Sequence, residues 1–453
     1  MSEPAQTLAP DPSAYRVRAR GVRWLTALGC ALVLLAGNAA GSYLTLRAPA
    51  GAESTAALPG QFAHPGRARG ADHPDRVALQ RLLDRRAAAV RDHDRAAFLA
   101  TVDPEAGPAS TEQALRFERQ RAVEFGQAEY TAGDALPEEL DRAALGRPLP
   151  ERALRLDVDF QYRLAHVDER AVGSTVRLVL VRRAGGWFVR SEQSAPPAGG
   201  TAQLWDFGEV RAVRGERSLV LGLSSVATLR RYAAEMDAAF PGVEAVWGTA
   251  WSRRVVLVVP RTQREMAALL GGRDGEYGQI AAVTTGEFNP GDQSVADRVT
   301  LNPQAFRGLG AVGRSVVLRH ELTHVATRTA TRTWTPMWLT EGFADYVGYR
   351  GSGVSPRVGA ADLLARVRAG SGPSELPTAG AFRATDSQLS QAYEQAWLAA
   401  RFIAERHGQA ALARFYRTVG ATPDGERRAF ATVLGTTREK FTADWLAHLE
   451  ELA

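Results

Sequence analysis

The spacing of apolar residues after residue 74 predicts helices first and strands afterwards. Between residues 75 and 102 apolar side chains recur at helical spacing, and a second helical stretch surrounds residues 115–125. From Leu154 to Leu164 apolar and polar residues alternate strictly, which predicts a half-buried antiparallel strand. Residues 174–193 read as a hairpin that turns at residues 184–186. Helices followed by an antiparallel sheet predict an α+β domain over residues 75–198.

The second half of the chain opens on alternating strand and helix patterns. Apolar strand candidates lie at 217–222, 253–260, 278–286 and 297–303, with helices at 225–240 (ended by Pro241-Gly242) and 262–271. Longer helical patterns follow to the C-terminus. We therefore expect a second α+β domain over residues 204–451, with a mostly helical C-terminal part and a linker before it, at 194–203.

The N-terminus has a different pattern. An uncharged run at residues 24–46 is long enough to span a membrane, and four Arg precede it, which predicts a signal anchor with residues 1–23 in the cytoplasm. Residues 47–74, rich in Ala, Gly and Pro, read as a flexible linker. The later domains would then lie outside the cytoplasm on a single-pass membrane protein. A cleaved signal peptide, and hence a secreted protein, is the competing interpretation.

Charge and cysteine content exclude some classes of site. The net charge is +5, but the basic residues are almost all Arg and are scattered, with Lys440 the one lysine. A dispersed excess of this kind is typical of a solvated surface and does not favour nucleic-acid binding. Cys30 is the single cysteine, so a Cys-based zinc ribbon and an intramolecular disulfide are excluded.

Two short stretches carry candidate chemistry. In "HELTH", His320 and His324 lie one turn apart on a predicted helix, the spacing that two imidazoles need to share a metal ion, and Glu321 lies beside them. "TWTPMWLTEGFADYVGY" predicts a second helix with Thr335 as N-cap and Pro336 as its first residue. If the two helices pack antiparallel, Glu341 supplies a third ligand. Asp345, four residues on, can accept a hydrogen bond from a ligating His.

Together these residues resemble the gluzincin zinc metallopeptidases of the thermolysin-like clan, and in particular the peptidase-MA-like group with its HExxH…WLxEGxAxY signature. The resemblance covers about residues 204–451. It implies that one Zn2+ is held by His320, His324 and Glu341 and that Glu321 is the general base. It also implies that Asp345 accepts a hydrogen bond from a ligating His, which we expect to be His320. Glu341 follows His324 by seventeen positions, a slightly shorter spacing than in thermolysin, so the turn between the helices must be tighter.

The same resemblance implies two further features. The segment "AAVTTGE" at residues 281–287 would be the strand at the sheet edge that pairs with an extended peptide. Tyr393 would stabilise the oxyanion of the tetrahedral intermediate, although an ordinary core position explains Tyr393 equally well. The implied reaction is hydrolysis of a peptide or protein substrate.

Residues 75–198 resemble the NTF2-like (SnoaL-like) fold through "LLDRRAAAVRDHDRAAFLATVDP" and the closing "GGWFVR" hairpin. We expect this domain to be a spacer, so that deleting it leaves hydrolysis largely intact. The alternative function is a catalytically silent zincin-like scaffold whose NTF2-like domain binds a ligand or a protein partner. The presence of Glu321 beside both His favours the enzyme.

Overall fold

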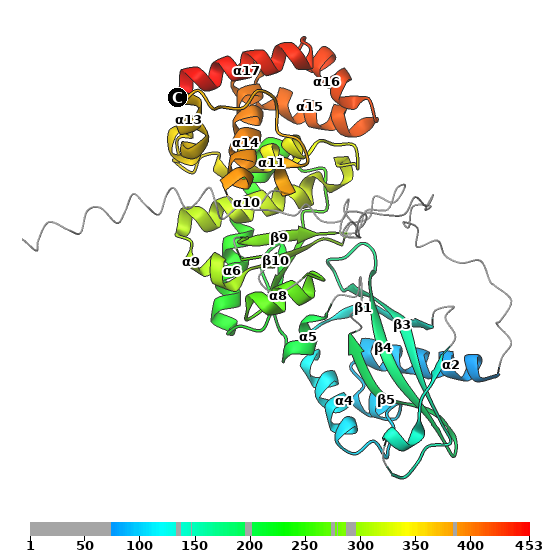
Figure 1. Ribbon diagram of the computed structural model, residues 1–453. Helices are drawn as coiled ribbons and strands as arrows, with labels where there is room; N and C mark the ends of the chain where they lie inside the picture. The colour runs from blue at the N-terminus through cyan, green and yellow to red at the C-terminus, as the bar shows by residue number, and fades with distance from the viewer. Residues whose placement is uncertain are drawn as a thin grey trace, which may run out of the picture.

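The computed structural model describes residues 74–453, apart from 133–136, 146, 195–201, 273–276, 279, 287–295 and 384–386. These residues form two units, each built on a five-stranded sheet, and a helical part that follows the second sheet (Figure 1). The predicted N-terminal segments 1–23 and 24–46, and all but the last residue of the linker 47–74, lie outside the described residues.

The first unit places its helices before an antiparallel sheet, as predicted. In β3 the residues Leu154, Leu156, Val158 and Phe160 are buried, because alternate side chains of a strand point to the same face. The strand order is β1-β3-β4-β5, with β2 paired to β3. The elements are α2 Pro74–Arg91, α3 Arg95–Leu99, α4 Pro108–Arg119, β1 Phe125–Ala132, β2 Glu138–Glu139, η2 Arg142–Leu145, β3 Arg152–Leu164, β4 Val172–Arg183 and β5 Gly186–Ser194.

Two helix boundaries in this unit differ from the prediction. The second helix ends at Arg119, and Phe125 begins strand β1. The first helical region is divided, since Asp94 takes an extended conformation and its side chain accepts a hydrogen bond from the Ala97 N–H. An N-cap of this kind starts a new helix rather than continuing the old one.

The second sheet contains both parallel and antiparallel pairs, so the chain is mixed α/β where we predicted the α+β class. Its order is β6-β7-β8-β10-β9, and the central strands β7, β8 and β10 run parallel. The helices between successive strands provide the crossovers that parallel pairing requires. The elements are α5 Leu204–Phe207, β6 Arg211–Arg214, β7 Ser218–Gly222, α6 Val226–Asp237, α7 Phe240–Trp247, β8 Val255–Val259, α8 Gln263–Leu269, β9 Ala282–Thr285, β10 Arg298–Leu301 and α9 Pro303–Gly308.

The rest of the chain is helical. Helix α10 lies between strand β9 and the C-terminal helices in Figure 1, so that it joins the sheet to the helical part. The elements are α10 Ala311–Thr327, η3 Arg328–Ala330, α11 Met337–Tyr349, α12 Pro356–Gly359, α13 Ala361–Arg368, η4 Ala381–Arg383, α14 Ser387–His407, α15 Gln409–Ala421, α16 Gly425–Val433 and α17 Arg438–Leu452.

Prolines at helix starts account for two further corrections. Pro241 does not end a helix but lies in the first turn of α7, where its missing N–H costs nothing. Pro336, not Thr335, is the N-cap of α11. Thr335 instead accepts a hydrogen bond from the Arg332 N–H, which closes the turn before the helix.

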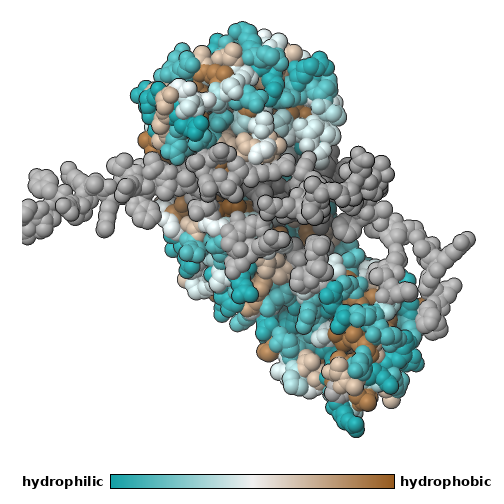
Figure 2. All heavy atoms as spheres, in the orientation of Figure 1, coloured by the Kyte–Doolittle hydropathy of each residue, from teal (hydrophilic) through white to brown (hydrophobic). Residues whose placement is uncertain are grey.

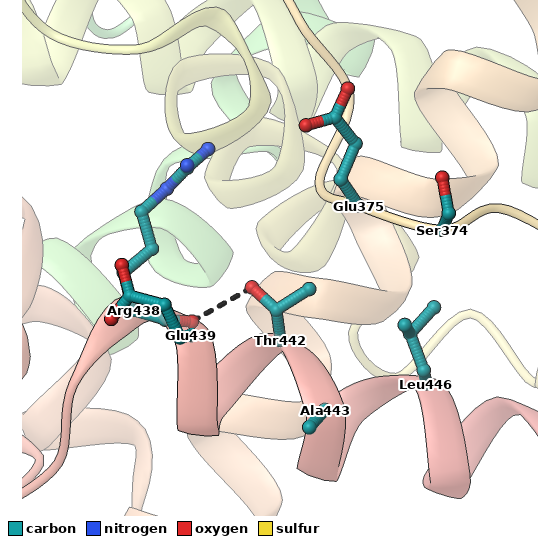
Figure 3. A pocket seen from close by; sticks show the side chains of 7 residues that line it. All are labelled: Ser374, Glu375, Arg438, Glu439, Thr442, Ala443 and Leu446. Carbon is teal, nitrogen blue, oxygen red and sulfur yellow. Dashed lines mark hydrogen bonds between the residues drawn. The ribbon is translucent and has the colours of Figure 1, made fainter.

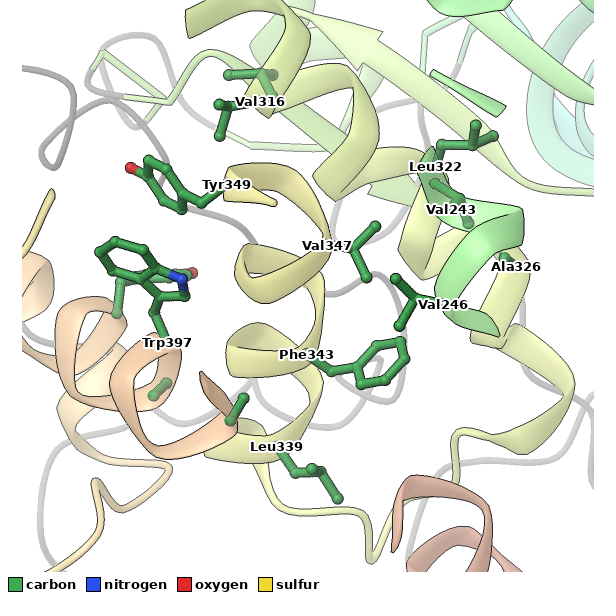
Figure 4. Close-up of a cluster of buried hydrophobic side chains, with 14 of the residues drawn as sticks. Val243, Val246, Val316, Leu322, Ala326, Leu339, Phe343, Val347, Tyr349 and Trp397 are labelled. Carbon is green, nitrogen blue, oxygen red and sulfur yellow. The ribbon is translucent and has the colours of Figure 1, made fainter. Parts of the chain in front are cut away.

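Helix α11 is buried on almost every side. Figure 4 shows Phe343 and Val347 directed towards α7, while Tyr349 lies against Trp397 of α14. The Tyr349 and Trp397 ring centroids are 4.3 Å apart. This packing from several directions fixes the position of Glu341 and Asp345, which lie on the same helix.

Gly342 allows α11 and α14 to approach closely, and its replacement gives a first testable prediction. A Cβ at this position would lie 2.2 Å from the carbonyl oxygen of Ala396, which is backbone and cannot turn aside. We expect Gly342→Ala to lower the free energy of unfolding by about 2 kcal/mol through overpacking. Thermal or urea unfolding measures this. Gly308→Ala, with nothing near its added Cβ, is the control, and an equal effect of both changes would contradict the assignment.

One hydrophobic cluster spans the two units, while the second unit has a further core of its own. The cluster that fills the first sheet continues into Leu204, Trp205 and Val210 and onto one face of β7 and β8. Trp205 packs edge-on against Phe125, with ring centroids 5.7 Å apart. Removing residues 75–198 would expose this apolar face of the second sheet, so a spacer that can be deleted without effect is not favoured.

Buried ion pairs close the same interface. Arg298 of β10 donates to both carboxylate oxygens of Asp168, at 2.6 Å each, and the Asp168 side chain is 1% exposed. Arg116 pairs with Asp206 across the units as well. Both contacts tie the first unit to the strands and loops around the second sheet.

Exposed apolar side chains are scattered over the described surface. Polar residues predominate on most of the described surface visible in Figure 2. Single exposed apolar residues are normal for a folded protein and mark no binding face. The large ones are Val77, Leu115, Leu149, Val226, Val312, Trp334 and Val358.

The expectation of a single-pass membrane protein is corrected. In the part of the chain that the structure describes, every helix is either too short or too polar to cross a membrane. The longest, α14, carries Glu394, Arg401 and Glu405, and charged side chains in a bilayer are costly. The single-pass membrane localisation is therefore withdrawn.

Candidate metal centre

Helices α10 and α11 bring the predicted residues together. Gly348 lies against the Val316 carbonyl, Asp345 contacts His320, and Glu341 contacts His324. Contacts therefore run in opposite directions along the two helices, which shows that they pack antiparallel as predicted. His320, Glu321 and Glu341 are fully buried, and His324 is 6% exposed.

Three ligand-type atoms converge between the helices. The Nε2 atoms of His320 and His324 are 2.9 Å apart. Glu341 Oε2 lies 3.4 Å from His320 Nε2 and 3.5 Å from His324 Nε2. Within the described residues these are the side chains whose spacing could hold a metal ion.

Asp345 determines which nitrogen of His320 is available. Its Oδ1 lies 2.7 Å from His320 Nδ1, and a carboxylate can only accept, so Nδ1 carries the proton and donates it. In the neutral ring, Nε2 then has a lone pair directed at His324 and Glu341. A carboxylate that accepts a hydrogen bond from the other ring nitrogen is a usual partner of a metal-ligating His.

The electrostatics favour a cation at the point of convergence. Burial alone would lower the pKa of His320, but the carboxylates of Asp345 and Glu341 outweigh it and raise that pKa. Burial would raise the pKa of Glu341, yet His324 and His320 hold it below its usual range. Both shifts mean that positive charge between these side chains is stabilised.

The surroundings of the Glu341 carboxylate also favour a bound cation. Both of its carboxylate oxygens are buried, and neither has a hydrogen-bond partner among the described residues. A buried carboxylate whose oxygens accept no hydrogen bond is costly, and a bound cation would offset that cost. The donor set of two imidazoles and a carboxylate therefore fits a bound metal ion, and these residues could hold one.

Glu321 lies beside the cluster, and only one of its two carboxylate oxygens accepts a hydrogen bond from a described residue. Its Oε2 accepts a hydrogen bond of 2.6 Å from Thr284 Oγ1, while Oε1 is buried without a partner among the described residues. Burial raises the pKa of this carboxyl against the opposing effect of the two His. We did not predict Thr284 from the sequence, since no spacing rule links it to the HELTH helix.

Strand β9 was predicted, and Thr284 lies on it. Ala282–Thr285 forms the edge of the second sheet, antiparallel to β10. The strand expected at residues 281–287 is thus confirmed over four residues. Residues 287–295 lie outside the described chain.

Tyr393 is buried in the hydrophobic core of the second unit. It is 3% exposed, and its ring packs edge-on against Phe382 at 5.2 Å between centroids. This is the environment of a packing aromatic. Its predicted role at an oxyanion stays a prediction.

A surface hollow lies elsewhere and shares no residue with the cluster. Its volume is about 330 Å³. Figure 3 shows Glu375 on one side and Thr442 and Leu446 of α17 on the other. The Thr442 hydroxyl donates to the Arg438 carbonyl, an ordinary helical contact. Nothing in this lining points to chemistry.

Comparison with models of known protein families and with curated proteins gave no match for this sequence.

Proposed function

We propose that this protein is a zinc-dependent peptidase of the gluzincin type. The observation that carries the proposal is the buried convergence of His320, His324 and Glu341 with the Glu321 carboxylate beside it. A structural metal site has no use for a fourth, separately held carboxylate. A hydrolytic site needs one as its base.

The donor set favours zinc over harder cations. Imidazole nitrogens suit zinc, whereas calcium and magnesium prefer all-oxygen sites. In a tetrahedral zinc site with bonds of about 2.0–2.1 Å, two ligand atoms lie about 3.3 Å apart. The separations of 2.9, 3.4 and 3.5 Å among the three atoms are close to this value. Three protein ligands also leave one position open, as catalytic zinc requires.

The chain's own residues supply the proton transfers. A zinc ion held by His320, His324 and Glu341 would make water acidic and polarise the scissile carbonyl. Glu321 takes a proton from the attacking water on its free Oε1 and delivers it to the leaving amine, since the same carboxyl can act as base and then as acid. Asp345 keeps the His320 ring oriented throughout.

Strand β9 is the proposed place for an extended substrate. It is the edge of its sheet, so its outward N–H and C=O groups can pair with a peptide backbone. Its neighbour on the inner side is β10, and its Thr284 reaches Glu321. A peptide added to this edge would therefore lie next to the base.

The first unit gives less support to the alternative, a silent scaffold with a ligand-binding cone. Its interior holds an ion-pair network in which Arg86 donates to Glu192 and Gln113, and Tyr130 also donates to Glu192. Arg86 is fully buried. A network whose groups satisfy one another is expected of packing rather than of a ligand site.

Metal removal tests the proposal. We expect the full chain to hydrolyse peptide bonds of an unfolded protein substrate or of a mixed peptide library. Dialysis against a chelator should abolish this activity, and about one equivalent of zinc should restore it. Peptide fragments are measured by mass spectrometry. If the zinc-loaded protein hydrolyses none of these substrates, the alternative function of a catalytically silent scaffold is favoured.

A further inference from the structure

We propose that Thr284 is a positioning residue for the base, Glu321, of the proposed peptidase. The inference rests on the proposed function for its kinetic consequence, but on contacts within the described residues for its geometry. Thr284 belongs to the sheet edge and Glu321 to helix α10, so one hydroxyl joins the proposed substrate strand to the proposed base.

The hydrogen bond is short and shielded from water. Thr284 Oγ1 lies 2.6 Å from Glu321 Oε2 and 3.3 Å from the Glu321 carbonyl oxygen. A hydroxyl has one proton, so it is given to the nearer, charged acceptor. Thr284 is 1% exposed and Glu321 is fully buried, which removes competition from bulk water.

The two carboxylate oxygens of Glu321 are thereby distinguished. Oε2 is occupied by Thr284, and Oε1 has no partner among the described residues. A glutamate side chain with no hydrogen bond can rotate about its last torsion, which has broad minima. Thr284 restricts that rotation and leaves the other oxygen for the proton of the attacking water.

The backbone around Thr284 is well placed to hold this geometry. Thr284 pairs with Val299 of β10, and Val299 is fully buried. A matched control must lie outside β9, because β9 is the proposed substrate strand. Thr300 meets this condition, since it lies on the neighbouring strand β10 and is 3% exposed.

The test compares Thr284→Val, Thr284→Ser and Thr300→Val in the full-length, zinc-loaded chain. Valine keeps the volume of threonine without the hydroxyl, and serine keeps the hydroxyl. We expect Thr284→Val to lower kcat by about 10- to 100-fold with KM and zinc content unchanged, as for other residues that orient catalytic groups. Thr284→Ser should recover most of the loss, and Thr300→Val should match wild type.

Crystal structures of wild type and Thr284→Val provide a readout independent of turnover. We expect Glu321 in one conformation on Thr284 in wild type, and displaced or in several conformers in Thr284→Val. An unchanged Glu321 in Thr284→Val, a kcat equal to wild type, or an equal loss in the Ser and Val variants would overturn the inference. Absence of hydrolysis in wild type would overturn the proposed function instead, and the crystallographic comparison would still decide on Thr284.

Discussion

Glu321→Gln is expected to abolish peptide hydrolysis while leaving metal binding intact. The amide has the size of the carboxylate and can still receive the Thr284 hydrogen bond through its oxygen, so the local packing of α10 is kept. It cannot take a proton from water. Loss of a general base costs about 100- to 10,000-fold in kcat, and initial rates on a peptide substrate measure it.

Zinc content separates this outcome from simple misfolding. Glu321 is not among the three converging residues, so the variant should bind as much zinc as wild type. Glu405→Gln, at an exposed ion pair with Arg401, is the matched control and should keep full activity. A Glu321→Gln protein with wild-type rates would show that the base lies elsewhere.

Asp168→Ala is expected to destabilise the whole molecule, because one hydrophobic cluster spans the two units. The change removes the carboxylate that pairs with Arg298, whose side chain is 13% exposed, and so breaks the bidentate ion pair in the interface. It also removes the acceptor of the Leu164 N–H. Breaking a buried pair on one side costs about 3–5 kcal/mol, and urea unfolding measures the loss.

An exposed pair in the same unit provides the control. Asp157 and Arg177 form a similar bidentate contact, but their side chains are 40% and 34% exposed. Asp157→Ala should therefore cost less than about 1 kcal/mol. Equal effects of the two changes would mean that the interface ion pair stabilises the protein no more than a surface ion pair does.

Because one hydrophobic cluster spans both units, deleting residues 75–198 should yield an insoluble or partly unfolded second unit.

The candidate site could be predicted from the sequence because its residues lie within short segments, where spacing alone places them on the same face of a helix. His320 and His324 are related by helix geometry, and Glu341 and Asp345 share a face one turn apart on the next helix. Strand β3 was predicted for the same reason, since a period of two is visible within a single segment. Both patterns need no knowledge of distant partners.

The features that the sequence did not predict depend on contacts between distant segments. The parallel pairing of β7, β8 and β10 leaves their residues uniformly buried, so no alternation shows the direction of the strands. Thr284 meets Glu321 across 37 positions. Asp168 and Arg298 are 130 positions apart, and each alone reads as a surface charge. The cluster that spans the two units was missed because the linker composition at 194–203 suggested separate domains.

The most direct test of the account is the zinc content of the full-length chain, measured by elemental analysis for wild type, His324→Ala and His407→Ala. The account predicts about one zinc per chain in wild type and in His407→Ala, whose exposed His lies at the end of α14, and a loss of zinc in His324→Ala. No zinc in wild type after reconstitution, or equal zinc in all three proteins, would contradict it.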